Sequence, residues 1–222
     1  MTDDAKQREY WNSQVHTRPY SHAIVKFFAE QRLKHINSLL NISTETRLLD
    51  VGCGDGFSTY YASDYKAKIF GVDRSLYMLN KHPLRSQVAC GNAYHLPFRD
   101  RYFDVVWSWE LLHHLSEPKA ALREMQRVSR KFVVIFEPNR YNPALFLYGL
   151  LKKEERWVLR SSRKFLREAA TQGGWEICLI ENCGAILPNA TPTLLFKLLR
   201  RLPFRLPLLG ISTLLLTKRR DD

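Results

Sequence analysis

The sequence predicts an α/β fold with a mostly parallel sheet that carries helices on both faces. From Arg47 onward, short apolar runs alternate with segments of helical periodicity. The first run passes into a turn with three glycines, and the second ends in Asp73. Alternating strands and helices form βαβ units, whose helices cover both faces of a parallel sheet. Because ligands of such sheets bind at the carboxyl ends of the strands, we expect the functional site there.

Length and composition predict one domain with a buried core. The chain has 222 residues, of which 45% are hydrophobic. Its four cysteines form neither a C-x-x-C pair nor a His/Cys cluster at zinc spacing, so we expect free thiols and no metal site. The N-terminus lacks the pattern of a signal peptide, and no apolar run approaches the roughly 18 residues of a membrane span. We therefore expect a cytoplasmic protein.

The N-terminal part predicts a helix over residues 21–40. Apolar side chains in this segment fall largely on one stripe, which is typical of a helix that packs against an edge of a sheet. A short polar stretch precedes it, and Tyr10 and Trp11 are its main apolar residues.

The central part of the chain supplies five of the predicted strands. Apolar runs predict strands at 47–51, 68–72, 87–90, 103–108 and 132–137, and helical periodicity predicts helices at 57–65, 75–81 and 118–130. Further on, Ser162 has the position of an N-cap for a helix over 163–171. Runs at 175–180 and 211–217 predict two closing strands, the last of them antiparallel, which gives seven strands in all.

The segment 194–202 combines an apolar and a basic side. On a helix, its leucines and Phe196 lie on one side, and Lys197, Arg200 and Arg201 lie on the other. The whole chain is basic, with a net charge of +12, which favours an anionic partner such as nucleic acid or a lipid surface. This helix could therefore cover a substrate pocket, lie on an anionic membrane, or pack with a solvated face.

The glycine-rich turn carries the strongest functional signal. Its sequence Asp50-Val51-Gly52-Cys53-Gly54-Asp55-Gly56 resembles the first motif of class I S-adenosylmethionine (SAM) dependent methyltransferases. A dinucleotide fingerprint would need a third glycine where Phe57 stands, which disfavours NAD. The resemblance implies a Rossmann-like fold with SAM as the cofactor.

The resemblance also implies which residues bind SAM. It assigns Asp50, Gly52, Cys53 and Gly54 to the methionine end, and Asp73 with the flanking Arg74 to the ribose. Asn92 and Ala93 follow the third strand, where the family recognises adenine; an acid is usual at the position of Asn92, but an amide still offers an acceptor and a donor. Trp109, at the end of the fourth strand, completes the predicted cofactor site.

The acceptor chemistry is predicted to follow the fourth strand, at His113 and His114. The family places an Asn/Asp-Pro-Pro-aromatic motif here in enzymes that methylate base amino groups, and this chain has neither that motif nor a Pro-Cys nucleophile. The paired histidines instead resemble the small-molecule branch, which is related to quinone-biosynthesis methyltransferases. A histidine can serve as general base if the acceptor must lose a proton. The alternative is that one of the two is structural.

These expectations combine into one methyltransferase domain over residues 1–222. Residues 1–44 would form a helical lid that includes Tyr10 and Trp11, 45–140 the SAM-binding core, and 141–222 a cap on the acceptor side. The expected acceptor is a small apolar or lipid-like molecule methylated at oxygen or carbon, with possible contact to an anionic membrane. The alternatives are an RNA methyltransferase that uses the basic C-terminal third, or a SAM-binding regulator without turnover. No motif indicates an oligomeric state.

Overall fold

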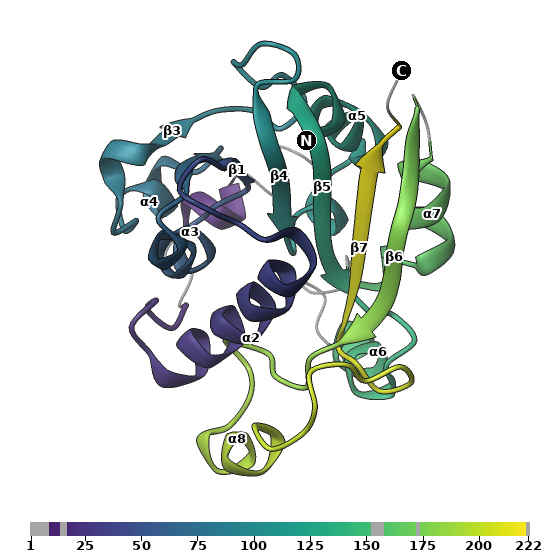
Figure 1. Cartoon of the computed structure of the whole chain (residues 1–222). Helices are drawn as coiled ribbons and strands as arrows, with labels where there is room; N and C mark the ends of the chain where they lie inside the picture. Colours follow the sequence, from purple (N-terminus) through teal and green to yellow (C-terminus); the bar gives the residue numbers. More distant parts are fainter. Residues whose placement is uncertain (1–8, 14–16, 152–157, 172–173, 221–222) are drawn as a thin grey trace.

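Seven strands form one sheet in the order β3-β2-β1-β4-β5-β7-β6 (Figure 1). The computed structural model describes residues 9–13, 17–151, 158–171 and 174–220. The strands are β1 (Arg47–Val51), β2 (Lys68–Asp73), β3 (Val88–Cys90), β4 (Phe103–Trp109), β5 (Ser129–Pro138), β6 (Trp175–Cys183) and β7 (Ser212–Arg219). Strand β7 runs antiparallel to β5 and β6, and the other neighbouring pairs are parallel. The predicted sheet and its antiparallel last strand are confirmed.

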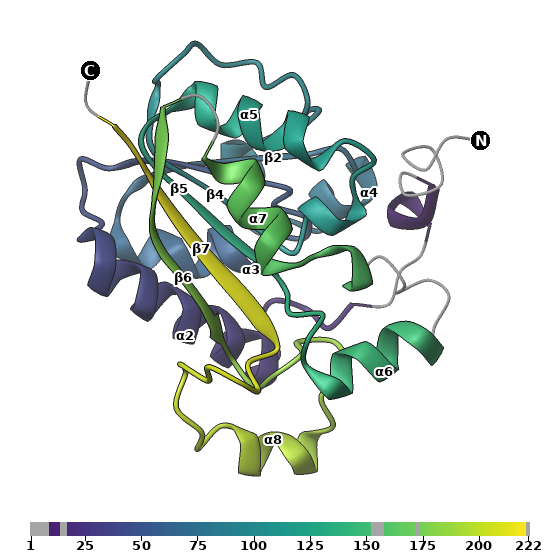
Figure 2. The same ribbon diagram turned by 90° about the vertical axis from the view of Figure 1, so that its right-hand side faces the viewer.

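Helices connect the strands and lie on both sides of the sheet (Figure 2). They are α2 (Ala23–Leu40), α3 (Phe57–Ala62), α4 (Leu76–Leu79), α5 (Pro118–Val128), α6 (Pro143–Leu151), α7 (Arg163–Ala170) and α8 (Thr193–Leu199). The Ser162 hydroxyl accepts the N–H of Phe165 at 3.1 Å, which confirms the predicted N-cap of α7. Across the described ranges, no helix has both the length and the apolar character that a membrane crossing requires.

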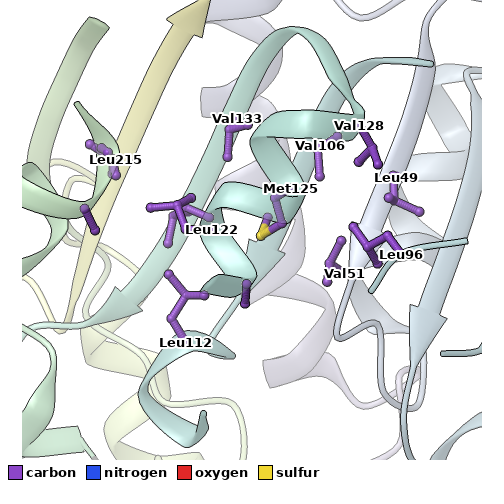
Figure 3. Close-up of a cluster of buried hydrophobic side chains, with 14 of the residues drawn as sticks. Leu49, Val51, Leu96, Val106, Leu112, Leu122, Met125, Val128, Val133 and Leu215 are labelled. Atoms are coloured by element: carbon purple, nitrogen blue, oxygen red, sulfur yellow. The ribbon is translucent and has the colours of Figure 1, made fainter. Parts of the chain in front are cut away.

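The core consists of two apolar layers, one on each face of the sheet. Figure 3 shows the first, in which Leu122 and Met125 of α5 pack on Leu49, Val106 and Val133 of three adjacent strands. All five side chains are fully buried, so each contributes about 1.5–3 kcal/mol of apolar transfer free energy. The second layer lies under α2 and α3 on the opposite face.

Helix α2 covers the middle of its face, so the expectation of a helix at a sheet edge is wrong. Phe28, Leu33 and Ile36 contact a layer that includes Trp107 of β4 and Leu214 of β7. The apolar stripe predicted burial but carries no information about which strands a helix meets. By lying across the central strands, α2 reaches the carboxyl end of β4.

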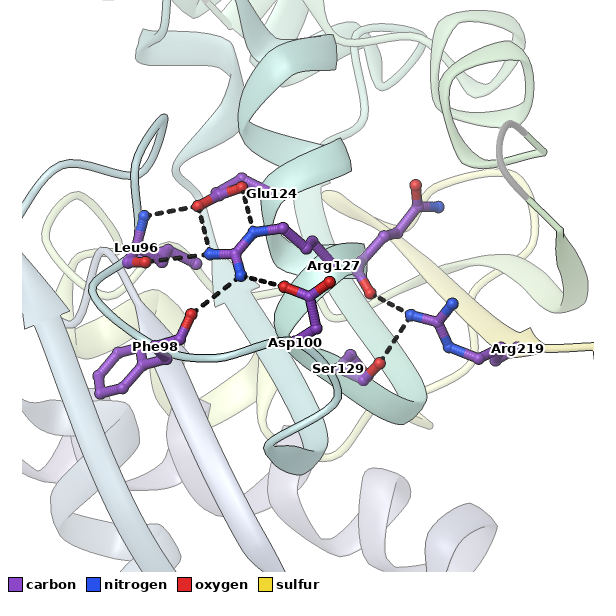
Figure 4. A network of polar contacts seen from close by, with 8 residues as sticks. Leu96, Phe98, Asp100, Glu124, Arg127, Ser129 and Arg219 are labelled. Atoms are coloured by element: carbon purple, nitrogen blue, oxygen red, sulfur yellow. Dashed lines mark hydrogen bonds and ion pairs between the residues drawn. The ribbon is translucent and has the colours of Figure 1, made fainter.

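Arg127 of α5 fixes the loop between β3 and β4 (Figure 4). Its guanidinium donates to the carbonyls of Leu96 and Phe98, at 3.1 and 2.9 Å, and to Glu124, at 2.7 Å. Glu124 in turn accepts the N–H of Leu96 at 2.8 Å. A planar guanidinium with several donors can hold a loop that has no regular structure of its own.

Asp50 is a buried carboxylate that joins β1 to α3. It is 1% exposed, and its Oδ2 accepts hydrogen bonds from the hydroxyls of Ser58 and Thr59, at 2.5 and 2.7 Å. Burial raises the pKa of Asp50 from 3.8 to about 6, against the opposing effect of these two hydrogen bonds. Near neutral pH the protein therefore holds a desolvated charge beneath the glycine-rich turn.

We expect Asp50→Asn to flatten the dependence of stability on pH between about 4 and 6. With a folded-state pKa near 6, the wild-type native state holds its proton more tightly than the unfolded chain. Protonated Asp50 therefore contributes to the free energy of unfolding. This contribution is fully present below pH 4 and is lost as the pH rises through 6, so the free energy of unfolding falls by about 3 kcal/mol.

Urea denaturation at several pH values measures this effect. The asparagine keeps an acceptor for Ser58 or Thr59 but has no proton to lose, so its free energy of unfolding should decline less. If the free energy of unfolding depended on pH equally in wild type and variant, the raised pKa of buried Asp50 would be contradicted.

Candidate functional site

A cavity of about 240 Å³ lies at the carboxyl ends of β1, β2 and β4. Nine of the eleven residues predicted for the site line it: Gly52, Cys53, Gly54, Asp73, Arg74, Asn92, Ala93, Trp109 and His114. Asp50 and His113 do not. Asp50 lies beneath the turn, and His113 lies behind His114. The cavity is therefore where the sequence predicted it, with two of the predicted residues in its supporting layer.

The glycine-rich turn forms one wall because its backbone adopts a conformation that side chains disfavour. Gly52 and Gly56 have φ angles of 78° and 90°. A Cβ on Gly56 would lie 2.5 Å from the ring of His82, and one on Gly52 would lie 3.0 Å from Leu111. The turn is also tied to the next strand, since the N–H of Gly52 donates to the carbonyl of Val72 at 2.7 Å.

Asp73 connects the end of β2 to this turn. One carboxylate oxygen accepts the N–H of Gly54 at 2.9 Å, and the other accepts the N–H of Ser75 at 2.7 Å. Burial raises the pKa of Asp73, while these backbone N–H groups act in the opposite direction. A carboxylate has about four acceptor positions, so Asp73 keeps acceptor capacity for a ligand in the cavity that it lines.

Asn92 follows β3 and forms a turn of its own. Its side-chain carbonyl accepts the N–H of Tyr94 at 3.1 Å. Asn92 thus stabilises its turn through a side-chain hydrogen bond, as asparagines in turns commonly do, and it also lines the cavity. The Nδ2 group is the donor that this side chain can still offer to a ligand.

The region after β4 supplies a more apolar part of the cavity, with Trp11, Leu111 and Leu115 in its lining. Two polar side chains, Glu110 and His114, also line this part. An apolar wall with few polar groups is typical of a site that binds an apolar small molecule and fixes its orientation through those groups.

Glu110 was not predicted from the sequence. Its backbone has a φ angle of 58°, which is uncommon for a residue with a side chain. The carboxylate pairs with the guanidinium of Arg32, which is 2% exposed and also donates to Ser212 at 2.6 Å. The rings of Phe28 and Phe136 lie 3.9 and 4.4 Å from that guanidinium. No local pattern signals a pair between residues of α2 and the end of β4.

The two neighbouring histidines have different surroundings. His113 is buried, and its Nδ1 lies 2.8 Å from Oε2 of Glu137, whose carboxylate also accepts the N–H groups of Leu112 and His113. His114 faces the cavity, with the ring of Trp11 against it at 5.4 Å. Burial, and to a smaller extent His113, hold the pKa of His114 well below its usual value. His114 is therefore neutral at pH 7, and the same burial disfavours its protonated form.

The described residues before α2, 9–13 and 17–22, form hydrogen bonds with residues that line the cavity. The hydroxyl of Ser75 donates to the carbonyl of Trp11 at 2.8 Å, and that of Thr17 donates to Asp55 at 3.0 Å. On the far side, the backbone N–H of Arg18 donates to the side chain of Asn189 at 2.9 Å. Trp11 lines the cavity and Tyr10 packs against it, while residues 1–8 and 14–16 of the predicted lid lie outside the described residues.

Helix α8 contributes no side chain to the lining of this cavity. Phe196 packs on Phe27 of α2, with 5.4 Å between the ring centroids, and Leu199 adds to the same contact. Other leucines of the predicted apolar side point to solvent, with Leu194 82% exposed. The apolar side of this helix is therefore only partly used inside the domain.

Comparisons with known proteins find methyltransferases. Residues 49–135 match the family model described as a methyltransferase domain. The chain is 28% identical to the ubiquinone biosynthesis O-methyltransferase of Nitrosomonas europaea over 58% of either protein. It is 27% identical to the 2-methyl-6-phytyl-1,4-hydroquinone methyltransferase of Synechocystis, over 57% of this chain and 44% of that enzyme. The chain spans about half the length of the first curated relatives it matches, from 36% to 58%.

The fold is also similar to that of solved methyltransferase structures. Magnesium protoporphyrin IX methyltransferase from Synechocystis with bound SAM superimposes with a TM-score of 0.64 at 14% identity, over 99% of this chain and 98% of that one. At this identity the likeness concerns the fold alone. Residues 49–135 therefore match a methyltransferase domain, and the chain is similar in sequence and in fold to SAM-dependent methyltransferases.

Proposed function

We propose that the protein transfers a methyl group from SAM to a small apolar or lipid-like acceptor, at oxygen or carbon. The observation that carries this proposal is the position of Asp73, whose carboxylate holds the glycine-rich turn and faces the same cavity as Asn92 and His114. Cofactor groups and acceptor groups thus meet in one space. When bound there, SAM would supply an electrophilic methyl group on a sulfonium.

Each end of the cofactor has matching residues in the cavity wall. Gly52, Cys53 and Gly54 would accept the methionine end, because a turn without side chains at the glycines admits a ligand close to the backbone. Asp73, flanked by Arg74, would accept hydrogen bonds from the ribose hydroxyls. Trp109 would pack on the cofactor from the end of β4. Asp50 would act indirectly, by holding α3 and the turn.

Adenine recognition by Asn92 and Ala93 needs one refinement. Because the Asn92 carbonyl already accepts the N–H of Tyr94, we assign its Nδ2 donor to a ring nitrogen of the adenine. The carbonyl keeps a second lone pair for the adenine amine. With this assignment, an amide can bind the adenine at a position where the family usually has an acid.

The acceptor is proposed to bind beside Leu111, Leu115 and Trp11. Methyl transfer from a sulfonium is an in-line displacement, in which alignment of the two reactants supplies most of the acceleration. His114 faces this space as a neutral imidazole and could take a proton from an acceptor hydroxyl. Relatives named for quinone methylation favour an apolar acceptor over a polar one.

The remaining assignments follow from this activity. Residues 1–44 would act as the lid and 141–222 as the acceptor-side cap of a single domain. Contact of α8 with an anionic membrane belongs to the proposal, since several of its leucines are exposed. RNA as acceptor rests on positive charge alone and leaves these leucines unexplained. A SAM-binding regulator without turnover is the other alternative, and the apolar space beside the proposed cofactor residues favours an enzyme over it.

We expect SAM and its demethylated product to raise the melting temperature, and NAD to leave it unchanged. At a ligand concentration 100 times Kd, binding stabilises the native state by about 2.7 kcal/mol. Asp73→Ala should weaken SAM binding by about 1–3 kcal/mol, since the ribose loses a charged acceptor. Calorimetric titration measures this loss, with Asp64→Ala as a control on an exposed acid outside the cavity. Equal stabilisation by NAD, or unchanged affinity of Asp73→Ala, would contradict the cofactor assignment.

Replacement of each histidine separately should distinguish their roles. His114→Gln should lower kcat about 10²-fold with SAM affinity unchanged, because it removes the proposed base. His113→Gln should instead lower the free energy of unfolding by about 1–3 kcal/mol, since the buried Glu137 carboxylate loses the imidazole and keeps only its two backbone N–H donors. Single-turnover assays and denaturation curves on both variants measure these effects. The reverse pattern would show that the structural and catalytic roles are exchanged.

A further inference from the structure

The exposed apolar side chains of this protein are concentrated at one end. Of the fifteen large apolar side chains that are exposed among the described residues, eleven belong to three segments. These segments are residues 141–151 with α6, residues 194–202 with α8, and the turn 206–209. We call their exposed side chains the apolar face: Tyr141, Phe146, Leu147, Leu150, Leu151, Leu194, Leu195, Leu198, Leu202, Leu208 and Leu209.

The three segments are physically joined. The side-chain amide of Asn142 donates to the carbonyl of Leu209 at 2.6 Å, and that of Asn139 donates to the carbonyl of Gly210 at 2.8 Å. Below the surface, Leu145 of α6 packs with Ile211. The turn 206–209 follows α8 in the chain after residues 200–205. Both views place α6, α8 and this turn at the same end of the molecule (Figures 1 and 2).

The most exposed leucines of the apolar face are more exposed than any large apolar side chain that the described residues carry outside it, where Leu76 is the highest at 62%. Leu208 is 84% exposed, Leu194 82% and Leu151 76%. A monomeric protein rarely exposes a contiguous patch of this kind unless another surface covers it. Helix α8 contributes Phe196 and Leu199 to a buried cluster with α2, and its exposed leucines lie outside this cluster.

Within the described segments that form the apolar face, the charged side chains are positive. Neither residues 138–151 nor residues 182–220 contain an aspartate or glutamate. Lys197, Arg201 and Arg205 are exposed beside the leucines, and Arg205 also pairs with Glu181 of β6 at 2.7 Å. Cations that border an apolar surface are what binding at an anionic lipid surface requires. A protein partner could cover leucines equally well, but only an anionic one would suit these cations.

We propose that the apolar face docks on an anionic lipid bilayer, with α6, α8 and the turn 206–209 entering the headgroup region together. The chain leads from this face straight to the cavity, because Pro188 and Asn189 line the cavity and α8 begins at Thr193. Docking would set the acceptor side of the cavity next to the membrane. In this respect the inference rests on the proposed function: an apolar acceptor would be drawn from the same bilayer that the face contacts.

Vesicle cosedimentation with the full chain tests the docking. Wild type should bind vesicles of phosphatidylcholine with phosphatidylglycerol and bind pure phosphatidylcholine more weakly. The combined variant Leu194→Ser, Leu198→Ser, Leu208→Ser should lose about tenfold or more in partitioning, since each leucine loses its apolar contact with the bilayer. Lys197→Glu with Arg201→Glu should lose about tenfold on anionic vesicles only. Leu39→Ser and Lys34→Glu, both exposed on α2, are the matched controls and should bind as wild type does.

Two measurements on the same proteins make the outcome decisive. SAM binding by calorimetry, without vesicles, should be equal in all these variants, which shows that they fold. Loss of vesicle binding by wild type, or full binding by the triple serine variant, would overturn the docking while leaving the proposed function intact. If wild type bound vesicles but did not bind SAM, the docking would stand and the proposed function would be wrong. If light scattering found a wild-type dimer that the serine variant breaks, the face would be an interface between two copies and the proposal would be wrong.

Discussion

The carboxylate of Asp73 is the interaction on which the site depends. It stands at the end of β2 and accepts the backbone N–H groups of Gly54 and Ser75, so it fixes two turns that follow adjacent strands. The glycine-rich turn can keep its positive φ angles because the carboxylate and the carbonyl of Val72 hold its N–H groups. Without these contacts the turn would have many conformations available, and a ligand would have to pay the cost of ordering it.

A second fixed point lies at the end of β4. Arg32 is buried among aromatic rings and pairs with Glu110, which brings a carboxylate to the apolar part of the cavity. Breaking such a buried pair is strongly unfavourable, because it leaves an uncompensated charge. Helix α2 is thus fixed relative to the sheet at the point where the acceptor is proposed to bind. Trp11, Thr17 and Arg18, which precede α2, are then held against the cavity wall by hydrogen bonds to Ser75, Asp55 and Asn189.

Local patterns predicted the sheet, the glycine-rich turn and most of the cavity. The alternation of strands and helices fixes the fold class, and the carboxyl ends of parallel strands bring Gly54, Asp73 and Asn92 to one edge, although they are distant in sequence. Contacts between remote elements could not be predicted in this way. The pair of Arg32 with Glu110, the division between His113 and His114, and the position of α2 on the face depend on packing that no single segment encodes. The exposure of the leucines on α8 could not be predicted either, because a helical pattern does not indicate which surface will cover the apolar side of the helix.

The central claim is that a methyl group passes from SAM to an apolar acceptor. The most direct measurement incubates the protein with SAM that carries a labelled methyl group, together with a lipid extract or with RNA, and then separates the fractions. The account predicts label in the apolar extract, and its loss in Gly54→Val, whose side chain would enter the cofactor's space at a φ angle of 54°. Label confined to RNA, or label in the extract that Gly54→Val leaves unchanged, would contradict it.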